Sequence, residues 1–349
     1  MKNKSGENMS QPSAGKIRVI IVDDSIVFRE VLAMGVSIDP AIEVVAKAVD
    51  PFDARDQLLQ YHPDVMICDV QMPRMNGIEF INRLLPQYPI PVIVVTQISS
   101  AVFDALNAGA VDFVTKPNVQ SPVSVEDFIN DLIFKIKIAA QSKVSIPEPS
   151  PDKARIAVGK LDTNRLIAMG ASTGGTEALF SIIKALPSSM PGILIVQHIP
   201  SVFSRMFAER LNNQTALNVK EAEDGDVMKQ GQVLVAPGGK HMRIKRWRDT
   251  YKVEILAEDK VNGHCPSIDV LFESVAKEAG RQAIGIILTG MGYDGAKGLL
   301  AIRRKGGRTI GQDEETSVVY GMPKASFNIG AVEKQAPLHQ IPQILLGML

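Results

Sequence analysis

The sequence contains little cysteine: Cys68 and Cys265 are the only two among 349 residues. They lie far apart in the chain, so they provide neither the spacing of a metal site nor a disulfide framework. No apolar run approaches the roughly 20 residues of a membrane-spanning helix, and residues 1–15 lack the apolar segment of a signal peptide. These absences predict a soluble cytoplasmic protein that does not insert directly into a membrane.

The sequence also lacks an excess of charge of either sign, since 38 basic residues balance 38 acidic ones. Proteins that bind nucleic acid or anionic membranes through general electrostatics carry a basic surplus. The balance therefore argues against both kinds of partner. What the chain does have is length and apolar content. At about 150 residues per domain the length predicts two domains, and 45% hydrophobic residues can fill two cores.

The first predicted domain, residues 16–139, alternates short apolar runs with helical patterns. Short apolar runs are typical of buried strands, whereas apolar residues spaced three or four apart are typical of helices. The predicted strands are 17–22, 42–48, 65–68, 91–95 and 111–115. Five strands that alternate with helices predict a parallel, flavodoxin-like α/β sheet with both faces covered.

Polar side chains follow these strands at the points where they end: Asp23, Asp24, Asp69, Thr96 and Lys116. Because the carboxyl ends of parallel strands meet at one edge of the sheet, we expect them to converge. Three converging carboxylates repel one another unless a hard cation lies among them, and oxygen ligands suit Mg²⁺. Asp69 is the predicted phosphoryl acceptor, with Lys116 and Thr96 contacting the phosphoryl group. Helix capping explains a single aspartate, but not five matched positions.

These motifs resemble those of the receiver domain of bacterial response regulators over about residues 16–138. They are Asp23-Asp24, Asp-x-x-Met-Pro-x-Met-x-Gly from Asp69, Thr96 and Lys116-Pro117. The resemblance implies that a histidine kinase donates a phosphoryl group to Asp69. It also implies that the backbone carbonyl of Gln71 joins Asp23, Asp24 and Asp69 in holding Mg²⁺.

The same resemblance implies a switch that responds to phosphorylation. Thr96 and Phe113 form the switch pair, with Lys116 beside them, and they couple phosphorylation of the aspartate to a change on the nearby surface. The sequence leaves open whether the Lys116–Pro117 peptide bond is cis.

The boundaries between the parts are predicted from composition. Residues 1–15 are rich in Ser, Asn, Lys and Gly and predict a disordered tail. Periodicity fades over 140–161, where three prolines fall within residues 147–151 and exclude the interior of a helix. We expect a Pro/Ser-rich tether that keeps two domains at high effective concentration. The second domain then covers 162–349.

A glycine-rich turn organises the second domain. In residues 165–176 a short apolar run leads into small residues and glycines, and a helical pattern follows at 177–186. Glycines allow a tight turn, and the N–H groups that open the helix suit a developing negative charge. Ser172 is therefore a predicted nucleophile. A phosphate- or dinucleotide-binding loop is the alternative, although Ser172 occupies the place of the second glycine of G-x-G-x-x-G.

Further strands and helices follow to the C-terminus, including short strands at 219–222, 232–236, 242–245 and 253–257. The alternation predicts a Rossmann-like, doubly wound parallel α/β domain. Among five histidines, only His198 directly follows a strongly apolar run, so it is the predicted general base. His241 and His264 are assigned to turns between the short strands.

A carboxylate is expected to fix the tautomer of the base. Asp294 lies in a glycine-rich turn after the most apolar run of the domain and is the first choice. Asp313 is the second choice, and Asp269 is interpreted as a helix cap. The order Ser172, His198, Asp294 differs from that of the α/β-hydrolases, but the same three roles occur in several orders on unrelated folds.

Five segments around these residues resemble the chemotaxis protein-glutamate methylesterase family, CheB, which covers residues 163 to the end. They are Gly170-Ala171-Ser172-Thr173-Gly174-Gly175, Gln197-His198-Ile199-Pro200, Ala236-Pro237-Gly238-Gly239-Lys240-His241-Met242, Pro266-Ser267-Ile268-Asp269-Val270-Leu271-Phe272 and Leu288-Thr289-Gly290-Met291-Gly292-Tyr293-Asp294-Gly295. The resemblance implies hydrolysis of methyl-glutamate on methyl-accepting chemoreceptors, with release of methanol, and deamidation of receptor glutamines. Ser172, His198 and Asp294 match the triad positions of the family.

The expected mechanism uses the backbone N–H groups of Thr173 and Met291 as the oxyanion site, and it requires no cofactor for the esterase. The protein would then be cytoplasmic and recruited to receptor arrays. One alternative is the same enzyme serving a different signalling array. Another is a phosphorylation-controlled binding module with a degenerate catalytic domain. A DNA-binding response regulator is disfavoured because the second half contains no basic recognition helix.

Overall fold

The computed structural model describes residues 15–97, 101–117, 122–144 and 161–349. The predicted tail, apart from its last residue, and most of the predicted tether lie outside the described residues. Within the described ranges, no helix combines the length and the apolar character needed to cross a lipid bilayer. Cys265–Pro266 is the cis peptide bond of this part of the chain, so Lys116–Pro117 is trans.

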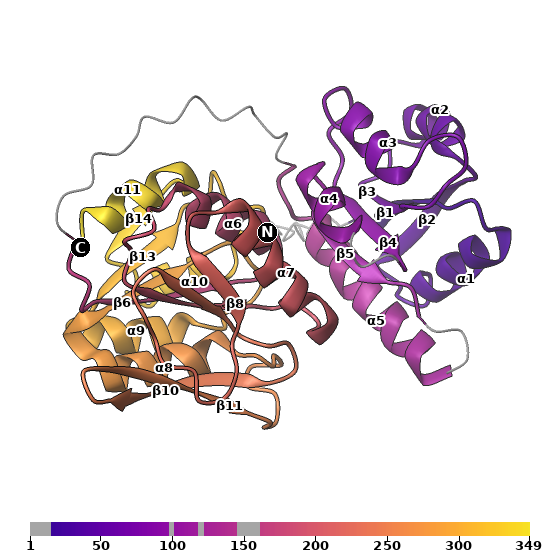
Figure 1. Ribbon diagram of the computed structural model, residues 1–349. Coiled ribbons are helices and arrows are strands. Elements are labelled where there is room, and N and C mark those ends of the chain that lie inside the picture. Colours follow the sequence, from indigo (N-terminus) through magenta and orange to yellow (C-terminus); the bar gives the residue numbers. More distant parts are fainter. Residues whose placement is uncertain (1–14, 98–100, 118–121, 145–160) are drawn as a thin grey trace, which may run out of the picture.

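The N-terminal domain is a five-stranded parallel sheet in the order β2-β1-β3-β4-β5, with helices on both faces (Figure 1). Its strands are β1 Ile17–Val22, β2 Ile42–Ala48, β3 Val65–Asp69, β4 Val92–Thr96 and β5 Asp112–Thr115. Its helices are α1 Ile26–Val36, α2 Pro51–Tyr61, α3 Gly77–Leu84, α4 Ala101–Asn107 and α5 Pro122–Ala139. The predicted flavodoxin-like fold is confirmed.

The alternation of side chains along a strand explains why both faces are covered. Successive residues of a strand point to opposite faces. In β1, Val19 and Ile21 pack with α1 and α5, whereas Ile20 and Val22 pack with α2, α3 and α4. All four side chains are buried, which is why the strand reads as a continuous apolar run.

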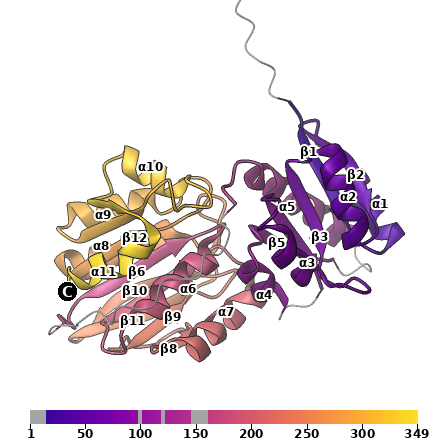
Figure 2. The same ribbon diagram turned by 90° about the horizontal axis from the view of Figure 1, so that it is seen from above.

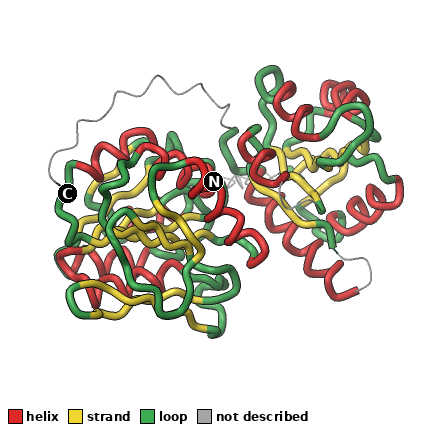
Figure 3. Tube along the Cα trace, in the orientation of Figure 1, coloured by secondary structure: helices red, strands yellow, loops and turns green. Residues whose placement is uncertain are grey.

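The C-terminal domain is a seven-stranded parallel sheet in the order β14-β13-β12-β6-β7-β9-β8. The strands are β6 Leu166–Ala171, β7 Gly192–Gln197, β8 Asn218–Glu221, β9 Gln232–Val235, β12 Ala283–Ile287, β13 Arg308–Gln312 and β14 Lys334–Ala336. The helices are α6 Gly175–Ala185, α7 Ser201–Gln214, α8 Ile268–Ala279, α9 Ala296–Arg304, α10 Met322–Asn328 and α11 Ile341–Leu346, with 3₁₀ turns η1 Gly280–Gln282 and η2 Leu338–Gln340. Helices α6, α7 and α11 cover one face, and α8 and α9 the other, as Figure 3 shows, so the doubly wound fold is confirmed.

Two details of this domain differ from the expectation. Strands β10 His241–Trp247 and β11 Thr250–Leu256 pair with each other in an antiparallel hairpin and lie outside the main sheet, against α8. The sequence predicted two strands here but gave no sign of their separate pairing. The edge strand β14 was not predicted, because three residues are too short to show a pattern.

The two domains pack directly against each other. The α4, β5 and α5 side of the N-terminal domain faces α7 and the turn that begins α6 (Figures 1 and 2). Phe113 packs edge-on against Phe203 with 4.7 Å between ring centroids, and Phe103 stacks on Phe207 at 6.0 Å. The buried apolar core therefore continues from one domain into the other.

Candidate active site

Ser172 directly follows β6, in the tight turn that leads into α6. Its N–H donates to the carbonyl of Thr289 at 3.0 Å, and its own carbonyl accepts from the N–H of Gly175 at 2.7 Å. The Nε2 amide of Gln197 donates to the same carbonyl at 2.8 Å. Gly174 has φ 74°, and a Cβ at Gly175 would lie 2.3 Å from Oε1 of Gln197. The turn therefore requires its glycines, and it leaves Ser172 half-buried.

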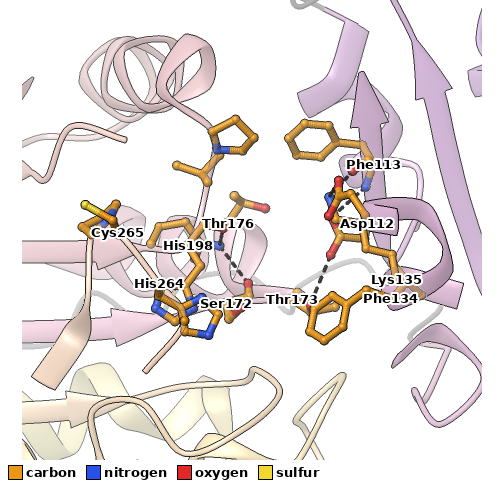
Figure 4. A pocket seen from close by; sticks show the side chains of 18 of the residues that line it. Asp112, Phe113, Phe134, Lys135, Ser172, Thr173, Thr176, His198, His264 and Cys265 are labelled. Carbon is orange, nitrogen blue, oxygen red and sulfur yellow. Dashed lines mark hydrogen bonds and ion pairs between the residues drawn. The ribbon is translucent and has the colours of Figure 1, made fainter. Parts of the chain in front are cut away.

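His198 directly follows β7, the neighbour of β6 in the sheet, and it bonds the predicted carboxylate. The distance from its Nε2 to Oδ2 of Asp294 is 2.9 Å, and the two side chains are 8% and 1% exposed. The other ring nitrogen, Nδ1, is buried and has no hydrogen-bond partner in the described part of the chain. Ser172 and His198 line the same pocket, of about 320 Å³ (Figure 4).

Several donors from the start of α8 and the loop before it surround Asp294. Its Oδ1 accepts from Oγ of Ser267 at 2.7 Å and from Nδ2 of Asn262 at 2.8 Å, and its Oδ2 accepts from the N–H of Ile268 at 2.7 Å. Burial alone would raise the pKa of Asp294, but the hydrogen bonds from His198 and Asn262 outweigh it and hold the pKa well below its usual range. The carboxylate is therefore charged and fixed in orientation at neutral pH.

The expected oxyanion donors lie next to Ser172. Thr173 follows it in the turn, and Met291 follows Gly290, whose Cβ, if it had one, would lie 2.6 Å from Cβ of Ser172. Among the hydrogen bonds of the described residues, none uses the N–H of Thr173 or of Met291. Both N–H groups are therefore available to an incoming oxygen.

The acidic residues of the N-terminal domain also come together. One carboxylate oxygen each from Asp23, Asp24 and Asp69 lie within 4.8 Å of one another. The Nζ of Lys116 donates to Asp23 at 2.9 Å and to Asp69 at 2.7 Å. Burial would lower the pKa of Lys116, but these two carboxylates raise it. Burial raises the pKa of Asp69 despite the ammonium. One ammonium faces three carboxylates, so positive charge is in deficit at the site. Three hard oxygen donors with this deficit fit Mg²⁺.

The predicted switch residues lie between this acidic site and the second domain. Thr96 is buried at the end of β4, and Phe113 on the neighbouring β5 contacts Phe203 of α7. The adjacent Asp112 accepts a hydrogen bond from Oγ1 of Thr173 at 3.1 Å. Side chains of both domains therefore face each other across the pocket that holds Ser172, as Figure 4 shows.

The structure also corrects the assignments made around the carboxylate. Asp269 is not a helix cap: it is buried in the first turn of α8, where it accepts from Nδ2 of Asn262 and the N–H of Gly298. Among the described residues, Asp313 forms no hydrogen bond or ion pair with a histidine, and its Oδ1 instead accepts from the N–H and Oγ1 of Thr316.

Sequence reasoning also missed the position of His264. This side chain stacks on His198, with 3.7 Å between ring centroids and 9° between planes. The Asn262-Gly263 dipeptide, a strong turn signal, is the feature that could have drawn attention to the segment.

Together the fold and the site define a class: a response regulator whose output domain is an esterase. The family model for the response regulator receiver domain matches residues 19–123, and the one for CheB methylesterase matches residues 167–345. The chain is 54% identical, over 96% of its length and 98% of the relative, to protein-glutamate methylesterase/protein-glutamine glutaminase 2 of Syntrophomonas wolfei subsp. wolfei. It is 48% identical to protein-glutamate methylesterase/protein-glutamine glutaminase 4 of Anaeromyxobacter dehalogenans, over 95% of the chain and 94% of the relative.

A solved structure gives the same result for the second half. The crystal structure of the Thermotoga maritima CheB methylesterase catalytic domain matches with a TM-score of 0.52 and 37% identity, covering 53% of this chain and 98% of that one. The chain belongs to the CheB methylesterase family. This result contradicts the alternative of a DNA-binding C-terminal domain.

Proposed function

We propose that this enzyme removes methyl groups from methyl-glutamate residues of chemoreceptors and deamidates receptor glutamines, through Ser172, His198 and Asp294. The 2.9 Å contact between His198 and Asp294, in the pocket that also contains Ser172, is the observation that carries the proposal. The names of the relatives, which specify glutamate methyl esters and glutamines, indicate the substrate class.

In the proposed mechanism, Nδ1 of His198 takes the proton of Ser172 while Oγ attacks the ester carbonyl. Asp294 holds the Nε2–H of the base and stabilises its cation. The N–H groups of Thr173 and Met291 bind the oxyanion, and loss of one such donor typically raises the barrier by about 3–4 kcal/mol. The base then returns its proton to the leaving methanol, or to ammonia from an amide. Water cleaves the acyl-serine by the same steps in reverse and releases the receptor glutamate.

Methanol release from methylated receptor membranes tests the nucleophile. With a small phosphodonor present, Ser172→Ala should abolish release, whereas Ser181→Ala, at an exposed serine of α6, should match the wild type. A fully active Ser172→Ala protein would remove the assignment. Labelling by a serine-directed fluorophosphonate provides a second readout: absence of Ser172 labelling in the wild type would favour the degenerate binding module.

We further propose that the N-terminal domain inhibits the enzyme until a histidine kinase phosphorylates Asp69. When bound among Asp23, Asp24 and Asp69, Mg²⁺ would supply positive charge that offsets the carboxylates and the phosphoryl oxygens. Lys116 contacts the acceptor, and Thr96 and Phe113 link it to the interface. Residues of both domains line the Ser172 pocket, and in this proposal phosphorylation shifts the population towards an arrangement in which the N-terminal domain no longer restricts it.

Removal of the inhibiting domain tests this part of the proposal. A variant lacking residues 1–140 should show higher basal methanol release than the unphosphorylated full chain. Equal or lower activity of a folded truncation would exclude simple inhibition. We propose that the protein acts at cytoplasmic receptor arrays, with a histidine kinase and the methyl-accepting chemoreceptors as its partners and without nucleic acid.

A further inference from the structure

A tight turn at residues 261–264 is built next to the His–Asp pair. Val261 and His264 exchange two backbone hydrogen bonds, of 3.0 and 2.9 Å, and the central residues Asn262 and Gly263 have φ 54° and 83°. Paired bonds around two residues with positive φ are the features of a type I′ turn, for which Asn-Gly is the preferred sequence. The conformation of this turn is therefore set by its own sequence.

The turn contacts both members of the pair. The side chain of Asn262 donates to Asp294 at 2.8 Å and also to Asp269 at 2.8 Å. Two residues later, the imidazole of His264 lies flat on that of His198, with 3.7 Å between centroids and 9° between planes. One short segment therefore donates a hydrogen bond to the carboxylate at one end and covers the face of the base at the other.

At neutral pH the ring of His264 is uncharged. Burial is the main cause that lowers the pKa of His264 to about 4; the neighbouring His198 and Lys260 also lower it, and Asp294 opposes them. Among the hydrogen bonds of the described residues, none involves a ring nitrogen of His264. No hydrogen bond joins this neutral ring to His198 or Asp294, so the contact that it makes with His198 is through its flat aromatic face.

A flat face supplies a constraint that the carboxylate cannot. The contact with Asp294 holds one atom of the imidazole, Nε2, and the ring could still tilt about that point. Stacking against a parallel ring removes this freedom. It thereby fixes the direction of the other ring nitrogen, Nδ1, which is buried and has no hydrogen-bond partner among the described residues. When His198 takes the proton of Ser172 it becomes a cation, and an uncharged aromatic face favours a cation stacked on it.

We propose that His264 is a positioning residue for the general base: its ring holds the imidazole plane of His198 so that Nδ1 stays directed at Ser172. The inference rests on the proposed function, because it assumes that His198 is the base. It adds a requirement for a flat ring at position 264, independent of ring nitrogens.

Kinetics of the phosphodonor-activated full chain test the requirement. His264→Ala should lower kcat for methanol release about 10- to 100-fold, the range expected when a reacting group is misplaced by about 1 Å, with KM within about twofold of the wild-type value. His264→Phe keeps a flat ring and should restore kcat to within about threefold of wild type. His339→Ala, the same substitution at an exposed histidine, should change neither constant.

Two kinetic outcomes would overturn the proposal. The first is a wild-type kcat in His264→Ala. The second is a His264→Phe variant as impaired as His264→Ala while its thermal unfolding matches the wild type, because that would assign the effect to a ring nitrogen. Failure of the proposed function looks different: Ser172→Ala would remain active.

A measurement that needs no turnover separates failure of the positioning role from failure of the proposed function. The chain has five histidines, so their imidazole signals can be assigned by single substitutions in a ¹³C-edited NMR spectrum. His198 should give one sharp set in the wild type and in His264→Phe, and broadened or doubled signals in His264→Ala. An unchanged His198 signal in His264→Ala would refute the positioning role whether or not methanol is released.

Discussion

The contact between Asn107 and Arg210 gives the most direct test of the proposed inhibition. Asn107 ends α4 of the N-terminal domain, and its Oδ1 accepts a hydrogen bond from Nη2 of Arg210 at 2.6 Å. Arg210, on α7 of the C-terminal domain, is 7% exposed and is held within its own domain by Glu177. The bond to Asn107 therefore exists only while the domains are together. Asn107→Ala removes it without changing a residue of the catalytic domain.

The expected size of the effect follows from the chemistry of this contact. A hydrogen bond to a charged group contributes roughly 1.5–3 kcal/mol. Arg210 keeps its ion pair with Glu177, and water can enter the space left by alanine, so the lower end, about 1.5 kcal/mol, is the reasonable value. Each 1.4 kcal/mol corresponds to about a tenfold change in an equilibrium constant. The open fraction, and with it the basal rate, should rise about tenfold if the open form is scarce at the start.

The assay compares methanol release with and without the phosphodonor. In Asn107→Ala the basal rate should rise about tenfold while the fully stimulated rate stays constant, so the stimulation ratio falls by the same factor. Asn82→Ala, at an exposed asparagine of α3, is the matched control and should leave the ratio unchanged. An unchanged basal rate in folded Asn107→Ala would refute the reasoning. An equal rise of both rates would place the effect in catalysis and not in closure.

Three further predictions follow from the two sites. Asp69→Asn should abolish stimulation by the phosphodonor and keep the basal methanol release, because the acceptor carboxylate is lost. Asp294→Asn should lower kcat by about 10⁴-fold with little change in KM, as steady-state kinetics would show. Stability should fall between pH 6.5 and 4, because over that range unfolded chains bind a proton at His264 that the folded protein excludes. The shift corresponds to at most about 3 kcal/mol, and partial exposure reduces it to about 1–2 kcal/mol, so urea unfolding of His264→Phe should depend less on pH than that of the wild type.

The periodicity of the sequence was sufficient to locate the candidate residues because parallel sheets are regular. Each apolar run became a strand, and parallel strands end at one edge, so the residue after each run had to lie near the others. Ser172 follows β6, His198 follows the adjacent β7, and Asp69 ends β3. This argument needs only that the strands run parallel, which their alternation with helices predicts.

The residues that were misassigned or missed lie outside the strand ends, so the direction of the strands does not predict their positions. Asp269 resembled a cap because it lies at the start of a helix. However, α8 begins in the protein interior, where the side chain of Asn262 and the N–H of Gly298 donate hydrogen bonds to the carboxylate of Asp269. The contact of Arg210 with Phe103 and Asn107 joins helices of separate domains. Such contacts depend on how two finished domains dock, and one domain's periodicity carries no information about the other's surface.

The 261–264 turn shows why locating the proposed catalytic residues is not the same as predicting turnover. The ends of β6 and β7 and the turn after β12 bring a serine, an imidazole and a carboxylate to one edge, but the strands set neither the tilt of the imidazole nor the orientation of the carboxylate. Here the loop that crosses from the β10–β11 hairpin to α8 contributes to both, because Asn262 donates to Asp294 and His264 stacks on His198. A chain could therefore retain all three strand-end residues and still turn over slowly if its Asn-Gly turn were lost.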